Sequence, residues 1–232
     1  PPTPPAPRAP PPAGARRSAN APRRGQVCRP LVNLLHSENH AVHTAALCAL
    51  RSYALDARFA MEVDQRGGLP QVCRLVFGDK SEAVARALDL LWLLAGADSV
   101  KAKLAKERDG AMLRQLVACV KSKNGSVLSA SVALLRKMAA VPEYCREIYD
   151  LSAHVDLVPM IAKVDDQTQL NAIGTIAALC LQEDQRAQIK TSGELIDRLQ
   201  KLASPPKQGA RAARVDPALA QRAEALVQVL QA

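Results

Sequence analysis

Apolar residues recur along this chain in blocks that repeat about every 41 residues. In the clearest copy, residues 67–76 (GGLPQVCRLV) precede a turn at Gly78-Asp79 and a long stretch, 83–95, whose apolar residues follow helical periodicity. Successive copies are spaced by 41, 44 and 41 residues, and a fifth copy opens at Gly193. Self-similarity at such a period is typical of solenoids, in which a unit buries its apolar faces against its neighbours.

The long stretch of each unit carries one apolar stripe. Its members lie three to seven residues apart, which places them on one face of an α-helix. The expected core positions are Leu47, Leu88, Val132 and Ile173; Leu50, Leu91, Leu135 and Ile176; and Tyr53, Leu94, Met138 and Leu179.

Shorter helices are expected between the long ones, at about 57–65, 98–108, 142–151 and 183–191. Pro142 stands where a first helical residue would, a position that proline favours. Asp216-Pro217 combines a preferred N-cap with proline at the next position, so the last long helix is expected to start there. Each unit is thus predicted to hold a short, a middle and a long helix.

The segment GGLPQVCRLV followed by SEAVARALDLLWLLAG resembles an armadillo repeat. The usual pattern of that family is Gly-x-Leu-Pro-x-Leu-Val-x-Leu-Leu, a short turn, and a helix with Ala-Leu-x-x-Leu. The resemblance covers about residues 27–232 and implies an all-α fold, a right-handed α-solenoid (an armadillo-type superhelix) of about five units. Three helices per unit favour this family over HEAT repeats, which usually have two.

The formal charge of +9 is concentrated in two Pro- and Arg-rich segments. Residues 1–29 hold six Arg and residues 203–215 hold three basic residues, and neither segment contains an acidic residue. The solenoid itself is therefore neutral, and aromatic residues make up only 3% of the chain, which argues against nucleic acid as a partner. Residues 1–26 are expected to form a disordered tail and 203–215 a loop. The end of an organelle transit peptide and a PxxP ligand are the alternatives for the tail.

No run of 18 uncharged apolar residues occurs, so no membrane span is expected. The first residue is Pro1 rather than Met, so a fragment or a processed form is expected. The six cysteines form no CxxC motif and are interpreted as reduced thiols, mostly small core residues, of a cytoplasmic protein. Import into an organelle and a ciliary location remain alternatives. The cysteines are Cys28, Cys48, Cys73, Cys119, Cys145 and Cys180.

The sequence holds no GxSxG, P-loop, GxGxxG or HExxH motif. Asp165-Asp166 is interpreted as a helix cap rather than an acid/base pair. His36, His40 and His43 lie near Cys48, but they are interpreted as a solvated turn, with helix beginning after Asn39, rather than as a zinc site. We therefore expect no catalytic residue, no metal and no cofactor, and a protein that is not an enzyme.

In the armadillo family the exposed face of the long helix lines a groove. Two rows on that face are Cys48, Asp89, Ala133 and Gly174, and Ser52, Leu93, Lys137 and Ala178. The importin-α branch carries Trp in the first row and Asn in the second, and these grip an extended basic nuclear-localisation peptide. Neither residue stands in those rows here, so such a peptide is not an expected partner.

A neighbouring row contains Arg51, Trp92, Arg136 and Ala177. Equivalent residues of packed helices lie roughly 10 Å apart, so Trp92 would lie between two arginines. Because Trp and Arg are enriched at binding hot spots, the row favours a partner that is acidic or carries aromatic side chains. The alternative is that Trp92 is half-buried packing. The predicted partner site comprises Arg51, Ser52, Asp89, Trp92, Leu93, Arg136 and Lys137.

These features together predict a non-enzymatic scaffold or adaptor that binds a protein or peptide in the groove. The alternatives are a nucleotide-exchange cofactor of an Hsp70-type chaperone, and the substrate-binding armadillo region of a larger ubiquitin-ligase or ciliary or cytoskeletal protein. The first unit is incomplete, so its apolar residues are expected to need cover from upstream sequence, from the tail or from another molecule. These residues are Leu31, Val32, Leu34 and Leu35.

Overall fold

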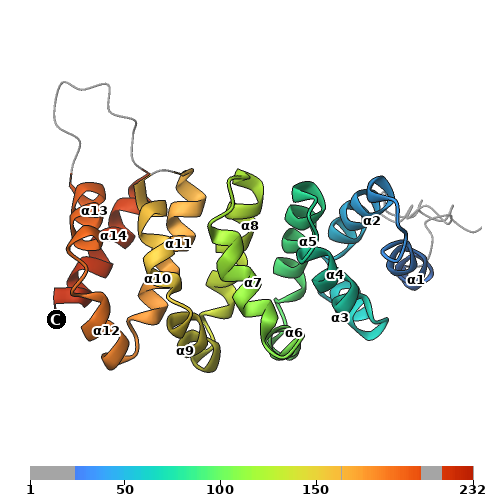
Figure 1. Ribbon diagram of the computed structural model, residues 1–232, viewed down its shortest axis with the longest axis horizontal. Coiled ribbons are helices and arrows are strands. Elements are labelled where there is room, and N and C mark those ends of the chain that lie inside the picture. Colours follow the sequence, from blue (N-terminus) through green and yellow to red (C-terminus); the bar gives the residue numbers. More distant parts are fainter. Residues whose placement is uncertain (1–23, 163, 205–215, 232) are drawn as a thin grey trace, which may run out of the picture.

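The computed structural model describes residues 24–162, 164–204 and 216–231, and within these ranges every regular element is helical. The units follow one another along the longest axis of the molecule, from the N-terminal helices to the C-terminal ones (Figure 1). This arrangement confirms the predicted all-α solenoid.

One long helix per unit forms a continuous layer in which each helix contacts the next. Each of the first four is 14 residues long, and each begins close to where the repeat pattern places it. The long helices are α2 (His40–Tyr53), α5 (Ser81–Leu94), α8 (Gly125–Met138), α11 (Asp166–Leu179) and α14 (Pro217–Gln231).

The remaining helices alternate between short and middle ones, as predicted. The short helices are α3 (Ala57–Gln65), α6 (Asp98–Lys106), α9 (Pro142–Asp150) and α12 (Glu183–Ile189). The middle helices are α1 (Arg24–Leu34), α4 (Gly68–Val76), α7 (Ala111–Val120), α10 (Ala153–Leu157), which runs into a 3-10 turn at Val158–Ala162, and α13 (Gly193–Ala203).

Two helix ends differ by a few residues from the boundaries expected for the tail and the loop. Helix α1 begins at Arg24, three residues before the expected start of the solenoid at 27, and α13 continues through Ala203, where the loop was expected to begin. Residues 1–23 of the expected tail and 205–215 of the expected loop lie outside the described residues.

Side-chain caps explain where three long helices begin. The Asn39 side chain accepts from the Ala41 N–H at 2.9 Å, Asp165 from the Thr168 N–H at 3.0 Å, and Asp216 from the Ala218 N–H at 2.9 Å. Each cap satisfies a backbone donor that has no partner inside its helix. The expectations for helix starts at Asn39, Asp165 and Asp216 are confirmed.

Side chains of the middle helices join successive units. Arg74 of α4 donates to the Leu35 carbonyl at 2.8 Å, and Gln115 of α7 donates to the Val76 carbonyl at 3.2 Å. Both bonds satisfy carbonyl groups that the end of a helix leaves open. In the next unit Asp156 of α10, 41 residues after Gln115, forms an ion pair with Lys121 at 3.0 Å.

The predicted apolar stripe is buried in all of its members except Tyr53, which is 38% exposed. Tyr53 belongs to the first unit, on which no earlier described unit packs, and its ring lies 5.2 Å from that of Phe59. The expectation that the first unit needs outside cover is wrong for Val32 and Leu35, which are buried, whereas Leu34 is 44% exposed.

Five of the six cysteines are buried, as expected for core residues, and Cys48, which the sequence placed on the exposed face of its long helix, is exposed. Burial raises the pKa of the Cys73 thiol to about 12 and that of Cys28 to about 11. A thiol that stays protonated at neutral pH is a poor nucleophile, which fits a packing role.

His43 is only 5% exposed, so the solvated-turn interpretation is wrong for this residue, whereas His36 and His40 are exposed. Its Nε2 bonds with the Ser37 carbonyl, and its Nδ1 is buried without a hydrogen-bond partner among the described residues. In the described part of the chain, no group of His, Cys, Asp and Glu residues could hold a metal ion.

The buried His43 should make stability fall at mildly acidic pH. Burial, followed by the charges of Arg74 and His40, lowers the pKa of His43 in the folded state. The unfolded chain therefore binds a proton on His43 near pH 6.5, whereas the folded chain does not. The free energy of unfolding decreases as pH falls through this range. Urea denaturation at pH 7.5 and 5.5 should show a larger loss for the wild type than for His43→Gln. Equal losses would contradict this role.

Candidate functional site

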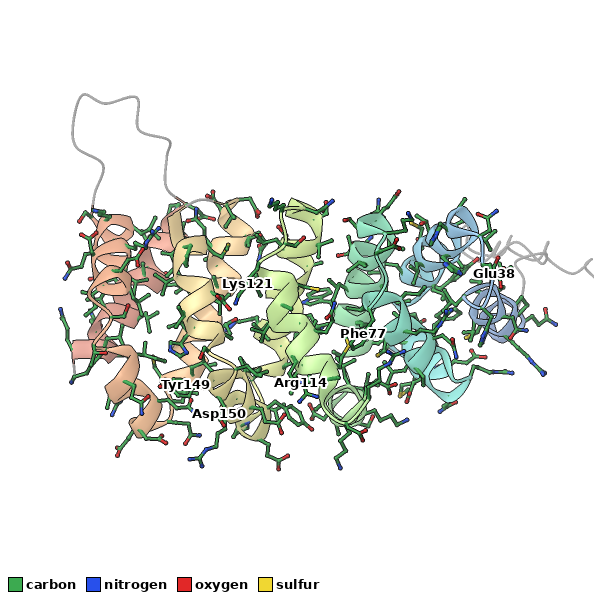
Figure 2. All side chains as sticks on the ribbon, viewed as in Figure 1. Glu38, Phe77, Arg114, Lys121, Tyr149 and Asp150 are labelled. Atoms are coloured by element: carbon green, nitrogen blue, oxygen red, sulfur yellow. The ribbon has the colours of Figure 1, made fainter. Side chains whose placement is uncertain are left out.

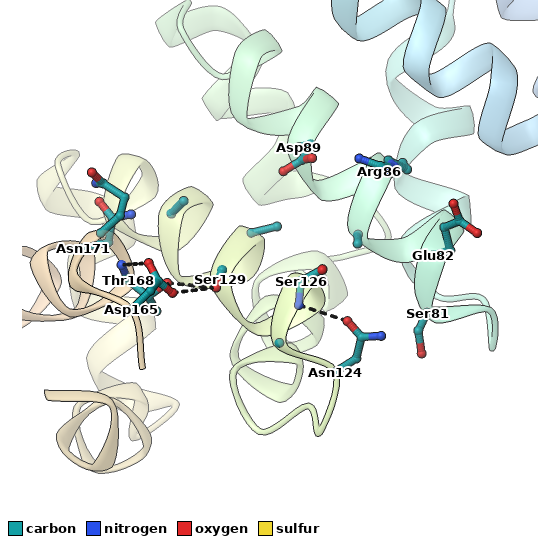
Figure 3. A pocket seen from close by; sticks show the side chains of 15 residues that line it. Ser81, Glu82, Arg86, Asp89, Asn124, Ser126, Ser129, Asp165, Thr168 and Asn171 are labelled. Atoms are coloured by element: carbon teal, nitrogen blue, oxygen red, sulfur yellow. Dashed lines mark hydrogen bonds between the residues drawn. The ribbon is translucent and has the colours of Figure 1, made fainter. Parts of the chain in front are cut away.

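Three successive long helices, α5, α8 and α11, border a hollow of about 670 Å³ (Figure 3). Polar side chains from all three helices face it, and none of the lining residues is a histidine or a cysteine. They include Glu82, Arg86 and Asp89 of α5, Ser126 and Ser129 of α8, and Asn171 of α11. The hollow thus presents both hydrogen-bond donors and acceptors across three units.

The lining residues occupy equivalent positions in the repeat. On α5 they lie at 82, 86 and 89, and the spacing of four and three residues places them on one helical face. The rows predicted from the sequence continue the same face toward the ends of the helices, at Trp92 and Leu93. The hollow and these rows therefore form one strip, which we call the long-helix strip.

A hydrogen-bonded cluster fixes one wall of the hollow. Thr168 Oγ1 donates to Asp165 Oδ2 at 2.7 Å, and Ser129 Oγ lies 2.9 Å from Thr168 Oγ1 and 3.4 Å from Asp165 Oδ2 (Figure 3). Burial by itself would raise the pKa of Asp165, but the hydrogen bonds from Thr168 and its neighbours hold it below its ordinary value. The cluster joins α8 to the N-terminus of α11 and so sets the spacing between two units.

Trp92 is 39% exposed, and Lys137 of the next unit covers one side of it. The Lys137 Nζ lies 4.0 Å from the centre of the Trp92 ring and donates to the Trp92 carbonyl at 2.6 Å. This bond satisfies a carbonyl in the last turn of α5. Burial, followed by the charge of Lys101, lowers the pKa of Lys137. The structure thus places Lys137, which the sequence predicted beside Trp92 in the partner site, over the Trp92 ring.

The other predicted site residues are distributed over three units. Arg51 of α2 approaches Asp89 of α5, with Nε 3.8 Å from Oδ2. The exposed Ser52 donates to the Cys48 carbonyl within its own helix, at 2.9 Å. Leu93 is partly buried against the core, and Arg136 packs on α11 at Gly174. That these residues bind a partner remains a prediction.

Sequence reasoning missed most of the hollow and placed only Asp89 and Ala133 of its members on the groove face. The missed side chains include Glu82, Arg86, Ser129 and Asn171. A signal was available, because Glu82, Arg86 and Asp89 form a polar stripe on α5 beside the apolar one. The prediction considered only the second half of each long helix.

A cleft of similar size, about 710 Å³, lies on the face that carries the middle and short helices. Arg114 of α7 and Asp150 of α9 contribute to it, and both are seen where these helices approach each other (Figure 2). Volume alone therefore does not select a site. This cleft is confined to two units, whereas the hollow spans three, and the exposed Trp92 lies one helical turn beyond its lining residue Asp89. The long-helix strip is therefore the stronger candidate.

Comparison with known proteins identifies the fold. No family model and no curated protein matches the sequence. A designed armadillo repeat protein, YIII(Dq)4CqI, is similar in structure, with a TM-score of 0.74 and 19% identity over 89% of this chain and 90% of that chain. The armadillo-repeats-only protein ARO from Plasmodium falciparum has a TM-score of 0.71 and 18% identity over 88% of this chain and 92% of its own.

A further designed armadillo repeat protein, YIII(Dq.V1)4CPAF in complex with the peptide (KR)4, has a TM-score of 0.73. Its identity is 17% over 89% of this chain and 90% of that chain. The structure thus has the armadillo-repeat fold. Among the described helices, none is both long enough and apolar enough to cross a membrane.

Proposed function

We propose that this chain is a non-enzymatic adaptor that binds an extended segment of a partner protein along the long-helix strip. The observation that carries the proposal is the hollow shared by α5, α8 and α11; the exposed Trp92 lies three residues beyond its lining residue Asp89 on α5. A strip that crosses successive units offers similar positions at regular intervals, which suits an extended chain. The designed relative in complex with (KR)4 shows that a protein of this fold can hold a peptide.

The partner segment is proposed to carry acidic or aromatic side chains where it meets the second half of the strip. Trp92 is exposed and Lys137 supplies positive charge at its ring, while Arg51 and Arg136 supply positive charge on the long helices α2 and α8. Asp89, Ser52 and Leu93 complete the proposed contact set. Because Asp89 already approaches Arg51, it also limits how much positive charge the first unit presents.

The proposed location is the cytoplasm. All six cysteines are free, including the exposed Cys48. Unpaired thiols are typical of proteins kept in a reducing compartment. The proposal of a non-enzymatic role is supported by the composition of the hollow, whose lining contains no imidazole or thiol to act as base or nucleophile.

The proposed function predicts that filling the hollow abolishes peptide binding. Ala133 lies on α8 at the centre of the hollow and is partly exposed, so Ala133→Trp should project a ring into it. Peptides selected from a random displayed library on the full chain should lose at least about tenfold in affinity, because their path is blocked. Fluorescence anisotropy with labelled peptides measures this.

The matched control is Ala187→Trp, which adds the same side chain at an exposed position on α12, outside the lining of the hollow. It should leave affinity unchanged, and circular dichroism should show that both variants keep their helices. Selected peptides that bind Ala133→Trp as well as the wild type would overturn the proposed function.

A further inference from the structure

Arg136 of α8 lies in the long-helix strip without a counter-charge. It is partly buried, and no described residue accepts a hydrogen bond from it or forms an ion pair with it. Its neighbours differ, since Arg51 approaches Asp89 and Lys137 binds the Trp92 carbonyl. A guanidinium carries five N–H donors, and withdrawing it from water without a partner is unfavourable. Arg136 is therefore prepared to accept an anionic partner.

Gly174 of α11 provides the space in which this guanidinium lies. A Cβ built on Gly174 would overlap the Nε, Nη1 and Cζ atoms of Arg136. The equivalent positions of the other units hold Cys48, Asp89 and Ala133, so the missing side chain is particular to this unit. Glycine in the interior of a helix is less favourable than alanine. Its presence here lets the guanidinium pack against the backbone of α11, which limits its rotation.

A second arginine adds positive charge at the same place. Helix α14, which packs on α11, carries the exposed Arg222. Burial and the charge of Arg222 both lower the pKa of Arg136, as expected where two cations lie near each other. In the described ranges neither arginine has a carboxylate partner. An anion placed between them would relieve the repulsion and satisfy open donors together.

We propose that Arg136 and Arg222, beside Gly174, form a subsite for an oxyanion on the bound peptide. The group is a side-chain carboxylate or a phosphoryl group, both of which match the fork of a guanidinium. This inference rests on the proposed function, because it assigns a chemical requirement to one end of the long-helix strip. Such a subsite favours partner segments that present an oxyanion at the place where they reach α11 and α14.

The test uses three labelled peptides of equal length: octaglutamate, a peptide with phosphoserine at alternate positions, and octaglutamine. Binding to the full chain is measured by fluorescence anisotropy at low ionic strength. Octaglutamate, the phosphopeptide, or both should bind more tightly than octaglutamine. Arg136→Gln and Gly174→Ala should each weaken that binding by about tenfold, since one removes the fork and the other displaces it.

Two controls are matched to these variants. Gly193→Ala changes an exposed glycine whose added Cβ would meet nothing within 4 Å. Arg146→Gln removes an exposed arginine on α9, which lies near Asp184 and does not line the hollow. Both should leave affinity within about twofold of the wild type, a change of less than about 0.4 kcal/mol.

The outcomes separate the two sources of the oxyanion. Binding of octaglutamate identifies a carboxylate, and binding of the phosphopeptide alone identifies a phosphoryl group. No preference over octaglutamine, or unchanged binding to both Arg136→Gln and Gly174→Ala, overturns the subsite. If Ala133→Trp still blocks the library-selected peptides in that case, the proposed function stands without the subsite. Circular dichroism checks that Gly174→Ala is folded, and Arg136→Gln supplies the result if it is not.

Discussion

Leu91→Ala should lower the free energy of unfolding by about 2–5 kcal/mol, because it deletes a fully buried side chain and leaves a cavity. Leu91 lies in the second half of α5, which contacts the long helix on either side of it. A loss at this position therefore weakens two interfaces between units, and the stability of a solenoid depends on such interfaces. Urea denaturation followed by circular dichroism measures the change.

The control for Leu91→Ala is Leu181→Ala, which removes the same atoms from a side chain that is 81% exposed after α11. Its effect should stay within about 0.5 kcal/mol, as for other exposed substitutions. A loss below about 0.5 kcal/mol for Leu91→Ala as well would show that the apolar stripe does not hold the units together.

The fold could be predicted because each unit repeats the same pattern of apolar residues. An apolar stripe at helical spacing is informative in one unit and becomes decisive when four units share its register. The caps at Asn39, Asp165 and Asp216 depend on contacts within a few residues, so local sequence was sufficient to place them. Predictions that rested on local or repeated information were therefore the reliable ones.

The errors in burial concentrate in the first unit. Tyr53 is exposed and His43 is buried, and both lie on α2. Aligning the units assumes that each has a neighbour on both sides, whereas α2 has a described long helix on one side only. The first unit is therefore the place where a repeat pattern transfers least well.

The contacts of the candidate site were harder to predict than its rows. Lys137 was expected beside Trp92, but its position over the ring and its hydrogen bond to the Trp92 carbonyl were not predicted, because the long Lys137 side chain crosses from its own row to reach them. The sequence analysis noted Gly174 only as a position where the importin-α branch carries tryptophan. Its missing Cβ leaves the space that Arg136 occupies. Both features depend on side-chain reach between units, which spacing along the chain does not encode.

Trp92→Ala should weaken binding of library-selected peptides by at least ~2 kcal/mol, or about thirtyfold in affinity, as expected when a central aromatic side chain is lost. Trp92 is 39% exposed, and Lys137 occupies one side of its ring. A partner can therefore contact the remaining surface while the lysine stays in place. Fluorescence anisotropy and thermal unfolding should be measured on the same sample.

The competing interpretation is that Trp92 mainly joins α5 to α8. In the alanine variant the Lys137 ammonium keeps its acceptor, because that acceptor is the backbone carbonyl of residue 92. Only the contact with the ring is lost, and an exposed cation–π contact contributes about 0.5–1 kcal/mol.

Lys137→Met is the matched variant, because it keeps most of the side-chain length but removes both the hydrogen bond and the charge. If Trp92 is a hot spot, Trp92→Ala lowers the affinity strongly and the melting temperature little. Lys137→Met then lowers the melting temperature at least as much as Trp92→Ala does. A drop in melting temperature of several degrees for Trp92→Ala, with unchanged affinity of the folded fraction, would assign the ring to packing instead.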